Sequence, residues 1–310
     1  MQQMSSARSA LLADLSALEP IALPLLDSQG CVLARDVVAP ADVPAFATAV
    51  CAGFAIRAND HEPGEVLRVI DDVPAGFRAS EALIPGTCIA ITRGAPVPDE
   101  ADTVVALASS RSVDGGVILD GTSPGSGVIS AGALITAGAP LARAGQLLDA
   151  ELIGILARAG NRSVEVHPRP RVLVVTVGTE YVEPGVPTPT GLVADHLSFL
   201  AAALVTEAGG TAFRIPPVLD DLAEVEAVVD DNAHRSDLIV LCGIDDQEAA
   251  VVAAALGLEV TAVGDHQVMV HGNREGAVIL GFADDPAALH VQARELLPAV
   301  LGRLMGREQS

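Results

Sequence analysis

The pattern of apolar and polar positions predicts an N-terminal region built from helices and extended segments. Apolar residues recur at helical spacing over residues 5–18, which predicts a first helix. We interpret residues 24–40 as a second short helix and residues 41–44 as an extended link. A further helix is predicted over residues 150–159, with Gly160 directly after its last turn.

From about residue 52 to residue 119 the pattern changes to short β-rich runs. Pro, Gly and Asp separate these runs, which is typical of strands joined by turns. The predicted strands are residues 54–57, 66–70, 87–91, 103–107 and 116–119. The segment therefore indicates a small β-domain.

Beyond Pro168 and Pro170, β-rich and helical runs alternate to the end of the chain. Strands are predicted at residues 171–177, 211–215, 237–242, 268–271 and 277–282. Helices are predicted at residues 192–208, 222–232, 247–256 and 286–305. Such alternation indicates a doubly wound, mostly parallel sheet, and ligands of such sheets bind beyond the carboxyl ends of the strands. We therefore expect a site in the loops 178–189, 216–221, 243–246 and 283–285.

Composition and charge exclude several classes of protein. Acidic residues outnumber basic ones 40 to 18, for a net charge of −22, and every basic residue is Arg. Such a chain is repelled by phosphate backbones, so nucleic acid is not an expected partner. The absence of Lys excludes Schiff-base chemistry and a P-loop lysine. We find no signal peptide and no membrane-spanning pattern, so we expect a cytoplasmic protein with no membrane partner.

Four segments, in order along the chain, match a known set of motifs. Residues 24–37 match an opening helix, and residues 42–57 resemble D-x-P-x-F…D-G-Y-A-V-R. Residues 85–98 resemble P-A-G-T-x-x-x-I-x-T-G-A-P-x-P, and residues 171–181 resemble a strand and loop that end in S-T-G-D-E-L. Together these motifs resemble the molybdopterin molybdenumtransferase family, which comprises the MoeA proteins and the gephyrin E domain.

The resemblance implies an α/β multidomain fold and a dimer. It implies an elongated, dimerising domain I of helical and extended structure at residues 1–50 and 128–168, and a β-rich domain II at residues 51–127. Residues 169–310 correspond to the family's molybdopterin-binding domain III, the doubly wound, mostly parallel α/β part. Residues 302–310 leave no room for the family's domain IV, so no C-terminal β-barrel is expected.

The family's reaction inserts molybdate into adenylylated molybdopterin and releases AMP, with Mg²⁺ at the phosphates. Transferred position by position, the family's carboxylates fall on Ala52, Val128 and Thr179, none of which is acidic. Gly178 and Glu180 of the same loop are kept. The resemblance therefore implies that most of the reaction's side chains are replaced in this sequence.

Acidic residues also stand where the family binds phosphate. The family's S-G-G-V-S turn is C-G-I-D-D at residues 242–246, which keeps Gly243 and gains Asp246. The P-G-K-P loop is V-G-D-H at residues 263–266, and the P-G-N-P turn is F-A-D-D-P at residues 282–286. Carboxylates at these turns repel phosphate. The resemblance implies that the remaining, vestigial cofactor-binding positions are Gly178, Glu180, Asp221 and Gly243. It implies that the family's catalytic positions are now Ala52, Val128, Thr179 and Asp246.

Several of these residues have a plainer interpretation. Glu180 is the position we assign to a metal, and the alternative is a loop carboxylate without a partner. For Asp221 a helix N-cap is an equally good explanation. Cys51 and Cys242 are either reactive thiols or inert packing. A new divalent-cation site would use Asp245, Asp246, Asp265, His266 and His271. The alternative is that these side chains are solvated and bind no cation.

Three functions remain open from the sequence. The first is a catalytically degenerate, dimeric scaffold in molybdenum cofactor biosynthesis, a pseudoenzyme for which no cofactor is expected. The second is an active molybdenumtransferase that uses Mg²⁺ and molybdate with adenylylated molybdopterin. The third is a regulatory partner of a full-length paralogue. The expected partners are a second copy of the chain, such a paralogue, or a short peptide tail of another protein.

Overall fold

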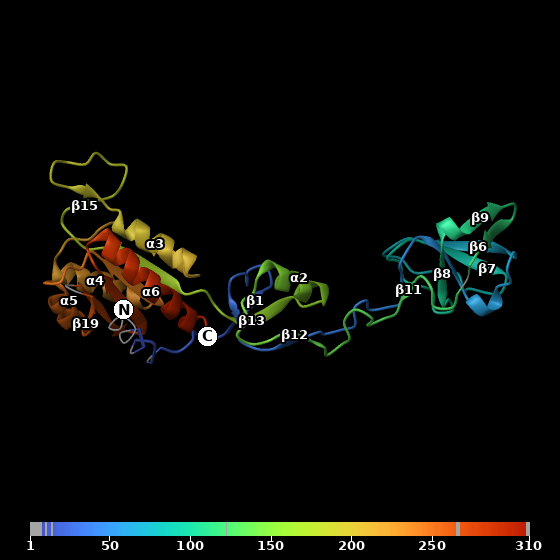
Figure 1. The fold of residues 1–310 in the computed structure, drawn as a ribbon, viewed down its shortest axis with the longest axis horizontal. Helices are drawn as coiled ribbons and strands as arrows, with labels where there is room; N and C mark the ends of the chain where they lie inside the picture. Colours follow the sequence, from blue (N-terminus) through green and yellow to red (C-terminus); the bar gives the residue numbers. More distant parts are fainter. Residues whose placement is uncertain (1–7, 10, 14, 122, 265–266, 308–310) are drawn as a thin grey trace. The chain divides into compact units, whose positions relative to one another are not determined.

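The computed structural model describes residues 8–307 apart from residues 10, 14, 122, 265 and 266 (Figure 1). The chain forms two compact units. The first unit comprises Met1–Asp36, Arg143–Ala150 and Ser163–Ser310, and the second comprises Val37–Ala142 and Glu151–Arg162. The division of the sequence into domains I, II and III stays a prediction.

The second unit is built around a six-stranded sheet with the order β8-β5-β7-β6-β10-β9. Its strands are β5 (Gly53–Ile56), β6 (Val66–Val73), β7 (Thr87–Ile91), β8 (Thr103–Ala106), β9 (Ser110–Val113) and β10 (Gly116–Leu119). All neighbours are antiparallel except β6 and β7. The five strands predicted in this segment are confirmed. Strand β9 was not predicted, because its S-R-S-V sequence lacks an apolar pattern.

Short pieces of structure complete the second unit. They are β3 (Val37–Val38), β4 (Thr48–Ala49), β11 (Val128–Ile129), β12 (Pro140–Ala142), the 3₁₀ turns η1 (Ala58–Asp60) and η2 (Leu107–Ser109), and most of α2 (Ala150–Arg158). Strand β11 pairs with β4, and β12 pairs with β3. Helix α2 is confirmed, and Gly160 follows it at φ +91°.

The first unit begins with a small antiparallel sheet, and here one prediction is wrong. Residues 24–40 do not form a helix: β1 (Ile21–Pro24) leads into turns, and β2 (Val32–Leu33) and β3 follow. The sheet has the order β1-β13-β2, with β13 (Ser163–His167) between the other two strands. Strands β1 and β2 pair with the distant β13, and β3 pairs with β12; such long-range pairing is not revealed by a local helix pattern. Of the helix predicted over residues 5–18, residues 8, 9 and 11–13 are helical.

The larger sheet of the first unit has the order β17-β14-β18-β21-β20-β19. Its strands are β14 (Arg171–Thr176), β17 (Thr211–Arg214), β18 (Leu238–Cys242), β19 (Glu259–Gly264), β20 (Gln267–Arg274) and β21 (Ala277–Phe282). Strands β17, β14, β18 and β21 run parallel, while β20 and β19 are antiparallel. Strands β18 and β21 are buried along their full length, as expected for parallel strands covered on both faces.

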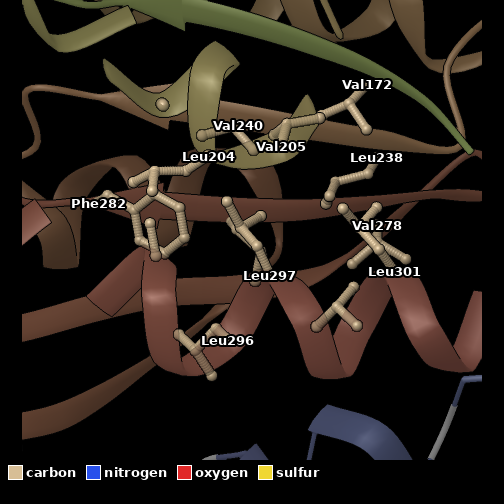
Figure 2. Close-up of a cluster of buried hydrophobic side chains, with 14 of the residues drawn as sticks. Val172, Leu204, Val205, Leu238, Val240, Val278, Phe282, Leu296, Leu297 and Leu301 are labelled. Atoms are coloured by element: carbon tan, nitrogen blue, oxygen red, sulfur yellow. The ribbon is translucent and has the colours of Figure 1, made fainter. Parts of the chain in front are cut away.

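Two apolar layers cover the faces of this sheet. On one face α3 (Leu197–Glu207) and α6 (Pro286–Leu304) lie side by side and pack with Phe282, Leu297 and other buried side chains (Figures 1 and 2). On the other face α4 (Leu222–Ala233) and α5 (Ala249–Leu256) form a second core with Leu173, Ile239 and Ile279. This arrangement of four parallel strands with helices on both faces agrees with the predicted doubly wound part.

Helix α3 starts later than predicted. The prediction placed its start at residue 192, but β16 (Val193–Ala194) pairs with β15 (Tyr181–Val182), and the helix begins at Leu197. Strand β19 was not predicted, although Gly257 precedes it and Gly264 ends it. Among the described residues, no helix combines the length and the apolar character needed to cross a bilayer.

Candidate functional site

The carboxyl ends of the four parallel strands hold the predicted site loops side by side. Gly178, after β14, donates its backbone N–H to the carbonyl of Val218 in the loop after β17, at 3.0 Å. Ile244, after β18, donates to the carbonyl of Phe282 at the end of β21, also at 3.0 Å. The four loops therefore meet at one edge of the sheet, as the sequence predicted; that they form a ligand site stays a prediction.

The two glycines kept from the family pattern are needed for close packing. Gly243 has φ +90°, and a Cβ there would lie 2.5 Å from the carbonyl oxygen of Val177. A Cβ on Gly178 would lie 2.7 Å from the ring of Tyr181. Any side chain would force these loops apart. The retention of both glycines is thus explained by the fold without a bound ligand.

Asp245 lies in the turn that leads into α5, whose helical residues begin at Ala249. Its Oδ1 accepts the backbone N–H groups of Gln247 and Glu248, each at 2.7 Å. Backbone N–H groups in and before the first turn of a helix are donors that bind phosphate and other anions in proteins. Here a carboxylate of the chain itself uses the two donors directly before the helix.

Glu248 and Asp220 form a carboxyl pair beside Asp245. Burial, the hydrogen bond with Asp220, and the charges of Asp220 and Asp245 raise the pKa of Glu248 to about 7. Two carboxyl groups can hydrogen-bond to each other only when one of them carries a proton. Glu248 therefore holds a proton up to about pH 7, and the binding of a further negatively charged group beside it is disfavoured.

Two other acids at this edge cap helices. Asp221 accepts the backbone N–H groups of Ala223 and Glu224 at the start of α4. Asp285 accepts that of Ala288 at the start of α6, at 2.8 Å. The N-cap interpretation of Asp221 is confirmed, and this role accounts for the residue without a cofactor.

Glu180 lies beside Tyr181, the single tyrosine of the chain. Burial and the nearby charges of Glu180 and Asp284 raise the pKa of Tyr181 to about 12, and Glu180 is hydrogen-bonded to it. The hydroxyl therefore stays protonated and available to donate to the carboxylate. Thr179, between Gly178 and Glu180, is exposed.

Over the described part of the chain, no three His, Cys, Asp or Glu side chains gather in a way that could hold a metal ion. Of the residues considered for a new cation site, Asp265 and His266 lie outside the described residues. His271, in β20, is buried, and its Nε2 lies 2.8 Å from Oγ1 of Thr261. The assignment of Glu180 to a metal stays a prediction.

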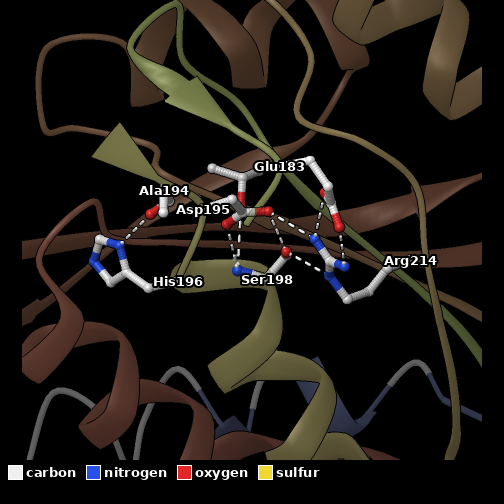
Figure 3. Close-up of polar contacts among 7 residues, drawn as sticks. Glu183, Ala194, Asp195, His196, Ser198 and Arg214 are labelled. Atoms are coloured by element: carbon white, nitrogen blue, oxygen red, sulfur yellow. Dashed lines mark hydrogen bonds and ion pairs between the residues drawn. The ribbon is translucent and has the colours of Figure 1, made fainter. Parts of the chain in front are cut away.

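The sequence did not reveal a buried charge network at the end of β17 (Figure 3). Arg214 binds both carboxylate oxygens of Glu183, at 3.2 Å each, and Oδ2 of Asp195 at 2.9 Å. Asp195 is only 1% exposed. Its two oxygens also accept hydrogen bonds from the hydroxyl groups of Thr176 and Ser198. No motif marks this network, because its members come from four separate segments between residues 176 and 214.

The carboxylates of Glu183 and Asp195 neutralise the positive charge of Arg214 in this network. Burial alone would raise the pKa of Asp195, but hydrogen bonds from Ser198, Thr176 and Arg214 hold it below its usual value. The guanidinium of Arg214 also stacks on the ring of Phe199, 3.6 Å from its centre. A cation held by two carboxylates has little attraction left for an anionic ligand.

The remaining predicted positions divide between the two units. Ala52 and Val128 are half-buried in the second unit, whereas Asp246 is an exposed residue of the first. That these three positions share one cleft stays a prediction. Cys242 is fully buried, and burial together with the charge of Asp195 raises the pKa of its thiol, so this cysteine is inert packing.

Comparisons with known proteins match most of the chain to one family. Residues 2–160 match the family described as the MoeA N-terminal region, domains I and II. A molybdopterin molybdenumtransferase 2 of Mycobacterium tuberculosis is 34% identical over 259 residues, covering 81% of this chain. Molybdopterin molybdenumtransferase 1 of the same organism is 29% identical over 321 residues, covering 92% of this chain and 75% of the relative.

Solved structures agree with these matches. A crystal structure of a molybdopterin biosynthesis MoeA protein from Pyrococcus horikoshii superposes with a TM-score of 0.81 at 26% identity, over 99% of this chain and 80% of that one. The chain described here spans 64% of the length of the molybdenumtransferase 2 relative.

The Glu248–Asp220 pair predicts a pH dependence of stability. Because the pKa of Glu248 is raised in the folded state, its contribution to stability is complete below its unfolded pKa and is lost as the pH rises through about 7. We expect Glu248→Gln to flatten the fall in unfolding free energy between about pH 4.5 and pH 7. Urea unfolding at several pH values measures this, with exposed Glu295→Gln as the matched control. Parallel pH profiles for wild type and Glu248→Gln would contradict the pairing.

The Arg214 network predicts strongly coupled substitutions. Arg214→Met leaves Asp195 buried without its cation, which we expect to cost about 3 kcal/mol of unfolding free energy. Asp195→Asn in the same background removes the stranded charge, so the double variant should be more stable than Arg214→Met alone. Chemical denaturation of Arg214→Met, Asp195→Asn and the double variant measures the coupling. Additive losses would show that the two charges do not depend on each other.

Proposed function

Because this chain belongs to the MoeA family, we propose that it serves molybdenum cofactor biosynthesis as a dimeric scaffold without molybdenumtransferase activity. The relation to molybdenum cofactor biosynthesis rests on the family. The loss of activity rests on the chemistry of the carboxyl edge of the larger sheet, where the family resemblance places the ligand site.

One observation carries the proposal. The carboxylate of Asp245 accepts the N–H groups of Gln247 and Glu248, the two backbone donors directly before α5, and places a negative charge beside this helix start. A nucleotide phosphate would have to displace this carboxylate and remain beside it. At a separation of about 4 Å near a protein surface, repulsion between two unit charges costs on the order of 4 kcal/mol.

The groups that the family uses do not fit the described residues. Mg²⁺ needs several oxygen ligands around one point. At this edge, however, Asp221 and Asp285 cap helices, while Asp220 is paired with Glu248. The phosphates of adenylylated molybdopterin need cations, but Arg214 is held by Glu183 and Asp195. We therefore derive no step of molybdate insertion for this chain.

The scaffold role is supported by what the chain keeps. Both apolar layers of the larger sheet are complete, and the β-sheet of the second unit has its own core. The fold is thus intact although residues that the family uses for ligand binding are replaced in this chain. On this proposal the protein acts by binding other proteins: a second copy of itself, a full-length paralogue, or a short peptide tail of another protein.

Nucleotide binding is the direct test of the degenerate site. We expect isothermal calorimetry to detect no binding of AMP in the presence of Mg²⁺ and molybdate, because carboxylates occupy the phosphate position. Binding in the micromolar range would overturn the proposal.

A gain-of-binding variant makes the test sharper. Asp245→Val with Asp246→Ser restores the family's residues and frees the N–H groups of Gln247 and Glu248, so we expect AMP affinity to rise at least about tenfold. The control is Asp27→Asn with Asp114→Asn, which removes the same charge at exposed positions elsewhere. An equal gain in the control would mean that net charge, and not Asp245, excludes the nucleotide.

A further inference from the structure

The second unit contains a cavity of about 530 Å³, a volume in the range of ligand sites. Its floor is apolar, because the lining residues Val97 and Pro98 are buried. Phe46 lines the same cavity and is 43% exposed. An exposed aromatic side chain beside an apolar floor is a feature of protein-binding surfaces. The cavity therefore offers an apolar contact that the fold leaves partly uncovered.

Hydrogen bonds fix the backbone around this cavity. Val97 donates its backbone N–H to the carbonyl of Ala47 at 2.8 Å. The lining segment 78–82 is held by Asp71, whose Oδ2 accepts the backbone N–H and the hydroxyl of Ser80 at 2.7 and 3.0 Å. The cavity is thus formed before any ligand arrives, which lowers the entropy cost of binding.

A second hollow, of about 340 Å³, adjoins the first at Glu81 and Ala82, which line both. Two exposed apolar side chains line this second hollow, Val69 at 41% and Ile84 at 54%. Two adjoining hollows with exposed apolar side chains suit an extended peptide better than a compact small molecule. We call the two hollows together the groove of the second unit.

The exposed rim of the first hollow is acidic. Glu81, Asp99 and Glu100 line it, and none of the three forms an ion pair with a described residue. The first hollow has a single arginine, Arg78, against these three acids. The second hollow has one arginine, Arg68, and one acid, Glu81. The charges therefore favour a basic segment at the first hollow and an uncharged one at the second.

We propose that this groove binds a short segment of another protein in which an apolar residue lies between basic residues and uncharged apolar residues follow. The apolar residue packs against Phe46 and Val97, and the basic side chains lie against Asp99 and Glu100. The net charge of −22 attracts such a segment over a longer range. This inference rests on the proposed scaffold role, for which it names the surface that takes a peptide tail and the chemistry of that tail.

Calorimetry with the full chain tests the groove. The probe is the peptide acetyl-Arg-Leu-Arg-Ser-Val-Leu-amide. In one control peptide Glu replaces each Arg, and in the other Ser replaces each apolar residue. We expect saturable binding of the probe that weakens as salt is added, because its charges pair with the acidic rim. Each control peptide should bind at least about tenfold more weakly.

Variants of the chain test the contacts. Phe46→Ala, and the double variant Asp99→Asn with Glu100→Gln, should each weaken binding of the probe at least about fivefold. These three side chains are exposed, so we expect the thermal unfolding curves to match wild type. The matched control, Asp120→Asn with Glu151→Gln, removes two exposed charges of the second unit outside the groove and should leave the affinity unchanged.

The outcomes separate a groove from general attraction to an acidic protein. Equally tight binding of the serine control peptide, which keeps both arginines, would overturn the groove. Titrations that do not saturate, or equal weakening by the matched control variant, would do the same. Calorimetry with AMP tests the first unit separately: AMP binding with intact probe binding would overturn only the loss of activity, and loss of probe binding without AMP binding would overturn only the groove.

Discussion

Burial of the adjacent parallel strands β14, β18 and β21 on both faces is the constraint on which the rest of the first unit depends. Strands β18 and β21 have no exposed residue, so the middle of the sheet offers no surface to a ligand. The loops after the parallel strands remain accessible, and parallel order brings four of these loops to one edge. The function of the unit is therefore decided by the charges of the loops at the carboxyl edge.

At that edge the protein's own carboxylates satisfy the groups that a phosphate would use. Asp221 and Asp285 each accept backbone N–H groups at the start of a helix, and Asp245 accepts those of the turn before α5. Glu183 and Asp195 hold the guanidinium of Arg214. These contacts stabilise the fold and, by the same means, remove the donors for an anionic ligand. In the function that we propose, a stable scaffold and a weak anion site follow from this one set of interactions.

The sequence was sufficient for elements with a strong local pattern. Strands β7 and β10 and helix α4 lie within one residue of their predicted bounds, because apolar periodicity and turn residues define them. It was insufficient where distant partners decide the structure: within residues 24–40, β2 pairs with β13 and β3 pairs with β12 instead of forming a helix, and the Asp195–Arg214 network joins separate segments. The loops at the carboxyl edge were predicted to lie together and do, and the structure decided between the two interpretations of Asp221 in favour of the N-cap.

The central claim is that this MoeA-family chain does not insert molybdate. The most direct measurement is complementation of a strain that lacks its own molybdenumtransferase, with the activity of a molybdenum enzyme as the readout and a full-length molybdenumtransferase as the positive control. The account predicts that this chain, expressed at an equal level, restores no activity above the empty vector. Restoration that approaches the positive control would contradict it.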